Sequence, residues 1–268
     1  MIACTRADTV FEDLPVMLHA VLFYFGAMKE VDVQIRRAQG VEDYQRVVEL
    51  EKQVWGYTDY ADLAAVPILM IANRFGGAVL VAEEQSGRMI GFSMANLGST
   101  PGNEEKKLFW WSHMTAVVDD YRNKGLGLQL KLRQREEALA SGIDEIHWTF
   151  DPLQRLNAHF NLHKLGVIVR SYEENVYGFS SSTLHRGLPT DRFVAEWRLK
   201  ADRVKASDEK SVRIEIPENI NELRRTDVAA AKAWQDRVRA ACQRYFREGY
   251  VITDFVEGAY LLSLTSAP

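Results

Sequence analysis

The sequence predicts an α/β fold in which a mixed sheet carries helices on both sides. Apolar strand-like runs alternate with amphipathic segments at the centre of the 268-residue chain, and strand pairs joined by turns flank that centre. The composition, 47% hydrophobic and 26% charged, is typical of a globular protein with a sizeable core. These observations together favour one large mixed-sheet domain with additions at its ends.

The first half of this core is expected to open with a strand and a helix. Val31, Val33 and Ile35 alternate with polar residues, as in a half-buried strand, and Gly40 leads into a helical segment that ends near Gly56. The next predicted elements are a second helix to about Phe75, strands at 78–82 and 89–97 joined by a turn at Ser86-Gly87, and a central strand at 108–118.

The second half keeps the β-α-β order. Leu128, Leu132 and Leu139 share one stripe of a helix that starts near Leu126, and Gly142 is placed to end it. The elements expected after it are a strand at 146–150, a short helix ending at Gly166, and an alternating strand at 193–199.

Three parts are predicted: an N-terminal extension at 1–30, the core domain at 31–200 and a smaller C-terminal α/β extension at 201–268. The apolar run at 14–27 predicts a packed helix, because it is shorter than the roughly 20 residues that a membrane span needs. Acidic residues before it argue against a signal peptide. Met28 would itself make a natural start, so whether residues 1–27 belong to the native protein stays open.

Charge and cysteine content exclude several classes of function. A net charge of -4 leaves no broad basic field, so we expect neither nucleic acid nor a membrane as partner. The two cysteines, Cys4 and Cys242, lack the spacing of a zinc or redox site, which predicts no metal and a cytoplasmic location. The oligomeric state is not readable, and a homodimer stays open.

A glycine-rich loop is the most informative segment. Arg122-Asn123-Lys124-Gly125-Leu126-Gly127 lies between the central strand and a helix, where backbone amides and the helix N-terminus can bind a pyrophosphate. The sequence pattern of the loop matches neither a dinucleotide-binding loop nor a P-loop. Taken alone, the loop is equally compatible with a turn that binds nothing.

The context of the loop resembles the coenzyme A signature of the GNAT N-acetyltransferase superfamily, Arg/Gln-x-x-Gly-x-Gly/Ala. A second segment, residues 157–166, resembles the family helix that ends in Lys-x-Gly. The resemblance spans roughly residues 31–199 and looks most like a little-characterised bacterial branch with a C-terminal extension. It implies a GNAT acyl-CoA N-acyltransferase fold.

The resemblance also implies which residues bind the acyl-CoA co-substrate. The central strand would pair with the pantetheine arm through its backbone, and the loop amides would hold the pyrophosphate. The implied coenzyme-binding residues are Thr115, Val117, Val118, Arg122, Asn123, Lys124, Gly125, Leu126, Gly127 and Asn157.

His113 is the predicted catalytic base, because an attacking ammonium must first lose a proton and a histidine pKa of about 6.5 suits that task. It precedes Arg122 by nine residues, a position similar to that of a strand histidine in arylalkylamine N-acetyltransferases. A hydrogen-bonded core histidine is the alternative. Many members carry an acidic tyrosine four residues before the helix-ending glycine, but this chain has Leu162 there.

Asp151 and Arg192 are predicted to contact substrate, with Arg192 able to clamp a carboxylate; ordering of the turn by Asp191 and Arg192 is the alternative. The predicted function is transfer of an acyl group, acetyl or larger such as succinyl, from acyl-CoA to the amine of a small metabolite, possibly an amino acid. Alternatives are a noncatalytic acyl-CoA-binding or sensor protein and a scaffold that binds nothing.

Overall fold

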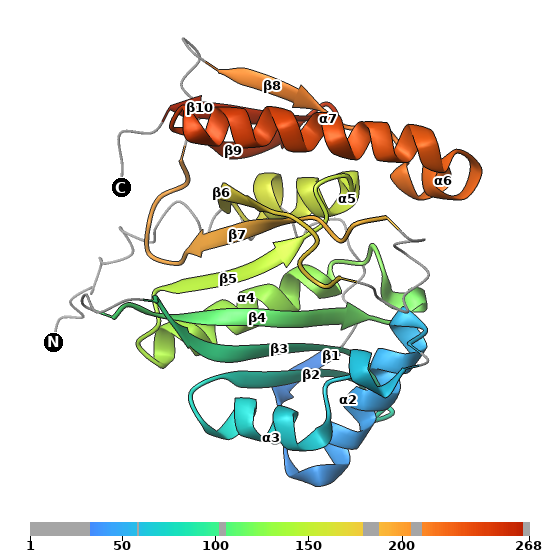
Figure 1. Cartoon of the computed structure of the whole chain (residues 1–268). Helices are drawn as coiled ribbons and strands as arrows, with labels where there is room; N and C mark the ends of the chain where they lie inside the picture. The colour runs from blue at the N-terminus through green and yellow to red at the C-terminus, as the bar shows by residue number, and fades with distance from the viewer. Residues whose placement is uncertain (1–32, 58, 102–105, 179–187, 205–210, 265–268) are drawn as a thin grey trace, which may run out of the picture. The chain divides into compact units, whose positions relative to one another are not determined.

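One sheet of ten strands runs through the described chain, and it confirms the predicted mixed α/β fold class (Figure 1). The computed structural model describes residues 33–57, 59–101, 106–178, 188–204 and 211–264. In spatial order the strands are β1 (Val33–Arg37), β2 (Ala78–Glu84), β3 (Met89–Ser99), β4 (Leu108–Val117), β5 (Glu145–Phe150), β7 (Arg192–Arg198), β6 (Ile168–Glu173), β9 (Tyr250–Val256), β10 (Ala259–Leu264) and β8 (Val212–Glu215).

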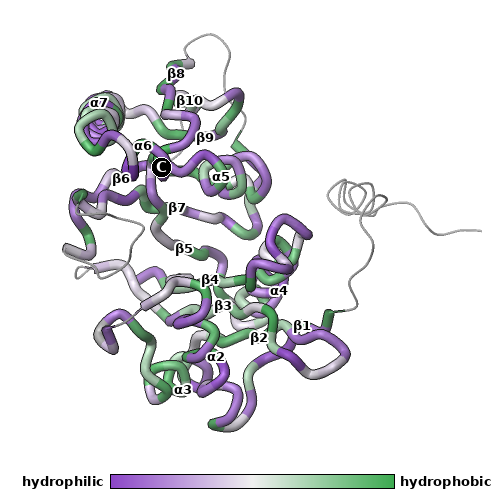
Figure 2. Tube along the Cα trace, turned by 90° about the vertical axis from the view of Figure 1, so that its right-hand side faces the viewer, coloured by the Kyte–Doolittle hydropathy of each residue, from purple (hydrophilic) through white to green (hydrophobic). Residues whose placement is uncertain are grey.

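Only the β4–β5 pair is parallel; the other neighbours in the sheet are antiparallel. The chain crosses from β4 to β5 through α4 (Leu126–Ala140), as a parallel connection requires. On the other side of β2–β4 lie α2 (Gly40–Trp55) and α3 (Val66–Arg74) (Figure 2). The glycine-rich loop therefore sits where β4 ends and α4 begins.

The remaining helices accompany the second half of the sheet. They are α5 (Arg155–Ala158), the single π-helical turn η4 (His159–Lys164), α6 (Ile220–Thr226) and α7 (Val228–Arg247), with short 3₁₀ turns η2 (Tyr60–Asp62) and η3 (Asp119–Tyr121). Strand β6 and helix α6 were not predicted, because only the first two residues of β6 are buried and its later part shows no alternation. Short elements of this kind carry little periodic signal.

The C-terminal strands continue the same sheet, since β9 pairs with β6 at Val169↔Ile252. Buried polar contacts also join the last part of the chain to the end of β5. The Arg224 guanidinium lies 2.9 Å from the Asp151 carboxylate, and the Tyr260 hydroxyl donates to the Pro152 carbonyl over 2.6 Å. The predicted boundary near residue 200 stays a prediction, and the N-terminal extension lies outside the described residues.

Helix α4 buries a different face from the one its leucine stripe suggests. Leu128, Leu132 and Leu139 are only partly buried against the core. The buried side chains of this helix are Leu126, Leu130, Lys131, Gln134 and Ala138. Two polar side chains thus face the sheet beneath β3 and β4.

Candidate functional site

Strands β4 and β5 separate halfway along their length. They pair only at Trp110↔Ile146 and Trp111↔His147, whereas β4 stays paired with β3 as far as Val117. Figure 1 shows β5 turning away from β4 in this direction. From Ser112 onward, the β4 backbone groups that face β5 therefore form no strand ladder with it. An extended ligand could take up these donors and acceptors as an added strand does.

A β-bulge begins where the two strands separate. Met94 of β3 faces Met114, but Ala95 faces Ser112, so His113 has no partner residue on β3. A bulge leaves one residue unpaired, bends the strand and re-aims its side chain, and such bulges are common next to active sites. The bulge thus falls on the residue that the sequence singled out as the base.

The His113 side chain is exposed, and no other described residue hydrogen-bonds to its ring. The surrounding protein nevertheless desolvates the ring enough to lower the pKa of His113 below its usual 6.5. An accessible ring among many protein atoms indicates a concave surface. This setting differs from that of a hydrogen-bonded core histidine, and the lowered pKa keeps the ring neutral near pH 7.

The loop after β4 is shaped by left-handed backbone. Asn123 and Gly125 have φ of 60° and 83°. Gly125 is the N-cap of α4, and no side chain caps this helix end. The amides of Tyr121, Arg122, Leu128 and Gln129 donate to carbonyls in or beside the loop, whereas no backbone acceptor in the described chain takes the amides of residues 123–127. Unused amides at a helix N-terminus are a favourable anion site.

The two loop cations lie on the surface beside these amides. Arg122 donates from Nε to the Val117 carbonyl over 3.2 Å and lies 2.8 Å from the Asp119 carboxylate. Lys124 Nζ lies 5.3 Å from the centre of the Tyr121 ring. Arg122 thus holds the loop against the end of β4, and Lys124 remains at its rim.

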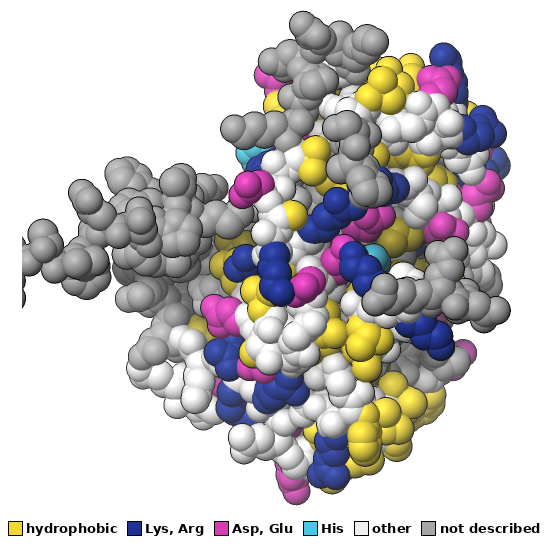
Figure 3. All heavy atoms as spheres, turned by 90° about the vertical axis from the view of Figure 1, so that its left-hand side faces the viewer, with side chains coloured by type: hydrophobic (Ala, Val, Ile, Leu, Met, Phe, Trp, Pro, Cys, Tyr) yellow, Lys and Arg dark blue, Asp and Glu magenta, His cyan; other side chains and the backbone are white. Residues whose placement is uncertain are grey.

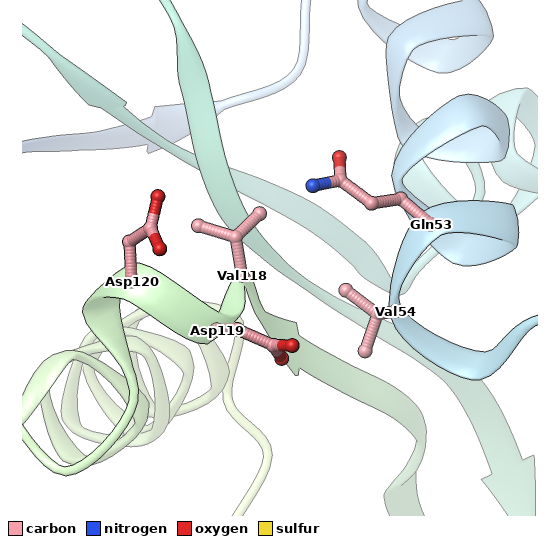
Figure 4. Close-up of a pocket in the computed structure, with 5 residues that line it drawn as sticks. All are labelled: Gln53, Val54, Val118, Asp119 and Asp120. Atoms are coloured by element: carbon pink, nitrogen blue, oxygen red, sulfur yellow. The ribbon is translucent and has the colours of Figure 1, made fainter.

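A hollow of about 230 Å³ opens next to the end of β4. Figure 4 shows Gln53 and Val54 of α2 on one side of it and Val118, Asp119 and Asp120 on the other. Its walls come from segments about 65 residues apart in the sequence, which only the fold brings together. The two carboxylates that line it, Asp119 and Asp120, favour a cationic over an anionic occupant.

A separate cluster of aromatic and polar side chains comes from β5, β7 and the segment after β6. The Tyr177 hydroxyl lies 2.9 Å from the Thr149 hydroxyl, and the Arg192 guanidinium stacks 5.2 Å from the centre of the Tyr177 ring. Burial raises the pKa of Tyr57, with Asp62 and Glu51 adding to the effect and Arg192 opposing it. Arg192 therefore lies in a setting of tyrosine rings, with one Nη also donating to the Asp191 carbonyl over 3.1 Å.

The other predicted residues are placed less favourably. Both Asp151 oxygens are used inside the chain, one by the Leu153 amide at 2.9 Å and one by Arg224. Asn157 is exposed on α5, and Leu162 is fully buried in the core. We therefore leave Asp151 out of the proposed site, while the coenzyme contact of Asn157 stays a prediction.

Three groups near the site were missed by the sequence reasoning: Lys131, Glu51 and Tyr57. Lys131 and Glu51 are buried charged residues, and burial raises the pKa of Glu51 to about 7. One Glu51 oxygen accepts from the Ala64 amide over 2.9 Å, and the other has no hydrogen-bond partner among the residues that the structure describes. Nothing in the local pattern marks these side chains as buried, because charged residues inside a helix normally indicate its solvated face.

Acidic and basic side chains are interspersed over the surface shown in Figure 3. No cluster of His, Cys, Asp and Glu in the described part of the chain has the makings of a metal site. None of the described helices has the length and apolar character to cross a bilayer.

No protein-family model and no curated protein matches the sequence. Solved structures do match. Naa20 of Chaetomium thermophilum in complex with a bisubstrate analogue has a TM-score of 0.49 at 18% identity, covering 66% of this chain and 94% of its own. An acetyltransferase of the GNAT family from Streptococcus pneumoniae has a TM-score of 0.47 at 18% identity, covering 62% and 98%.

The ribosomal-protein-S18-alanine N-acetyltransferase from Escherichia coli has a TM-score of 0.45 at 14% identity, covering 66% of this chain and 98% of its own. The Streptococcus pneumoniae protein is described as a member of the GNAT family, whose motifs the two sequence segments resemble. Identities below 25% and TM-scores below 0.5 say nothing about activity or substrate.

Proposed function

We propose that this chain is an acyl-CoA-dependent N-acyltransferase in which an amine attacks the thioester directly. The observation that carries the proposal is the unpaired edge of β4, which starts at the bulge and ends at the open amides of residues 123–127. An acyl-CoA has the matching order of groups: a thioester, an amide-bearing arm, and a pyrophosphate. A strand edge followed by an anion site suits that order.

In this proposal each part of the coenzyme has its place. The pantetheine amides pair with the backbone from Thr115 to Val118, and the pyrophosphate lies on the amides of Asn123 to Gly127. A Cβ built at Gly127 would meet nothing within 4 Å, so space is free above the first turn of α4. Arg122 and Lys124 add charge at the rim.

The acyl group then lies beside the bulge, with His113 as the base. Its neutral ring takes a proton from the acceptor ammonium, directly or through water, and the free amine attacks the thioester carbonyl carbon. The carbon–sulfur bond breaks, and the second proton of the attacking nitrogen passes through water to the thiolate, which leaves as the free thiol of CoA. Buried Leu162 offers no proton, so no side-chain acid is assigned.

Arg192 suits an acceptor or acyl group that carries a carboxylate. A guanidinium binds carboxylates in a bidentate way, and the Arg192 guanidinium lies 5.2 Å from the centre of the Tyr177 ring. We therefore favour small amines such as amino acids as acceptors, and acetyl or succinyl as the acyl group. Homodimer formation and a cytoplasmic location stay predictions.

A matrix of acyl-CoA thioesters and amines tests this function, with release of free thiol as the signal. The proposal expects steady release of CoA that depends on one class of amine and on the thioester. Thioester binding without release would instead favour a noncatalytic acyl-CoA-binding protein, which the buried Leu162 makes the second candidate. No shift in melting temperature with any CoA ester would refute both.

A further inference from the structure

Two polar side chains of α4 are buried directly beneath the bulge. Lys131 is 4% exposed and Gln134 is fully buried. The Lys131 ammonium donates to the Ser112 hydroxyl over 2.7 Å and lies 3.3 Å from Gln134 Oε1. Gln134 Nε2 in turn donates to the Ser93 hydroxyl over 2.7 Å, and that hydroxyl is 3.2 Å from the Thr115 hydroxyl.

These contacts bracket the irregular part of β4. Ser112 comes just before His113, and Thr115 comes just after Met114. Ser112 is bonded to α4 directly, and Thr115 is linked to α4 through Ser93. Because Lys131 and Gln134 are three residues apart, they share one helix face. A sliding of the strand by one residue would break both connections.

Lys131 also reaches β5. We call the place where β4 and β5 separate, beyond the pair Trp111↔His147, the β4–β5 fork. The Lys131 ammonium lies 3.9 Å from the centre of the Trp148 ring on β5. Ser112 and Trp148 are the first residues beyond the last β4–β5 pair, Trp111↔His147. The ammonium therefore touches both strands at the point where they separate.

Stability does not account for a lysine here. No carboxylate pairs with Lys131 in the described chain, and desolvation lowers the pKa of Lys131 to about 7. Burying an unpaired cation costs several kcal/mol, which an apolar side chain of the same length would avoid. What the lysine adds is a directed hydrogen bond and a cation–π contact.

We propose that Lys131 and Gln134 are positioning residues: a polar clamp from α4 to Ser112, Ser93, Thr115 and Trp148 that holds the bulge in register and the β4–β5 fork open. The catalytic consequence rests on the proposed function, whereas the effect on β4 does not. With the clamp in place, His113 and the β4 edge keep one geometry relative to a bound thioester.

Lys131→Met tests the clamp, with Thr253→Val as the control, since the latter removes a buried hydroxyl in β9. Hydrogen exchange of the amides from Ser112 to Val117 should become about tenfold or more faster, while the melting temperature stays equal or rises. The single-turnover rate should fall by about 10- to 100-fold, as expected for a misplacement of about 1 Å. Thioester affinity should change by less than about threefold, and Thr253→Val should leave β4 exchange unchanged.

Ser112→Ala removes only the hydroxyl that accepts from Lys131, and it should reproduce the local exchange effect even if Lys131→Met does not fold. Unchanged β4 exchange in the folded variants would overturn the clamp. A lower melting temperature with faster exchange throughout the sheet would also overturn it, since Lys131 would then be merely structural. If the wild-type protein binds no CoA thioester, the proposed function fails while the exchange measurement still decides the clamp.

Discussion

A side chain at Gly127 is expected to block the coenzyme without harming the protein. Gly127 lies in the first turn of α4 and does not have a positive φ. A Cβ built there would meet nothing within 4 Å. The folded chain therefore has room for alanine or valine. A bound pyrophosphate on the amides of residues 123–127 would occupy that same space.

Substitution of Gly127 is expected to stabilise the folded protein but to weaken its binding of acyl-CoA. Replacing a helical glycine by alanine stabilises by about 0.5–1 kcal/mol, so Gly127→Ala should raise the melting temperature by roughly 1–4 °C. Loss of one charge-assisted hydrogen bond to the pyrophosphate costs about 1.5–3 kcal/mol, which is a drop in affinity of about 10- to 150-fold. Gly127→Val, with its larger side chain, should weaken binding further and abolish it in practice.

Titration calorimetry with an acyl-CoA measures the change in affinity, and thermal melts measure the change in stability. Gln129→Val is the matched control, because it adds a β-branched residue to the same turn of α4 on a different side of the helix. Its affinity should stay within about twofold of wild type. A Gly127→Val protein that is folded and binds acyl-CoA with unchanged affinity would refute the placement of the pyrophosphate.

Three further predictions concern the base, the N-terminus and a buried acid. His113→Ala should lower the single-turnover rate by about 10²- to 10⁴-fold while thioester affinity stays nearly constant. It should also remove an acidic limb of the pH–rate profile below 6.5. Near wild-type turnover would dismiss His113 as the base. A chain starting at Met28 should keep full turnover because the first described strand starts at Val33, and a folded but inactive truncation would contradict this. The raised pKa of Glu51, about 7 against 4.5, means that the folded state binds its proton more tightly, so stability should be lost as pH rises from 4.5 through 7. Glu51→Gln should therefore raise the melting temperature at pH 8 but not at pH 4, and an equal change at both would speak against a buried titrating carboxyl.

Much of the local structure could be read from the sequence. Strand alternation and glycine positions correctly indicated the hairpin of β2 and β3, the central strand β4, and the start of α4 after the glycine loop. The loop was recognisable because left-handed turns favour Gly and Asn, and Asn123 and Gly125 adopt such backbone. His113 was selected by spacing and resemblance, and its role stays a prediction.

The geometry around these residues was decided by the tertiary structure. Ser112 and Trp148 are 36 residues apart, and Lys131 meets both of them only because α4 folds back under the fork. The stripe of Leu128, Leu132 and Leu139 even suggested another buried face for this helix. Periodicity in one segment records which side chains are apolar, but it does not record which neighbour covers them.

Sequence alone thus indicated the order of most of the elements, the position of the glycine-rich loop and a candidate base. Only the fold decided that β4 slips by one residue at His113, that β5 turns away beyond His147, and that Arg192 lies against Tyr177. Local patterns carry turn and burial preferences, because these depend on a residue and its near neighbours. A bulge, a fork and a buried lysine depend on free energies summed over segments far apart in the chain, which no local pattern contains.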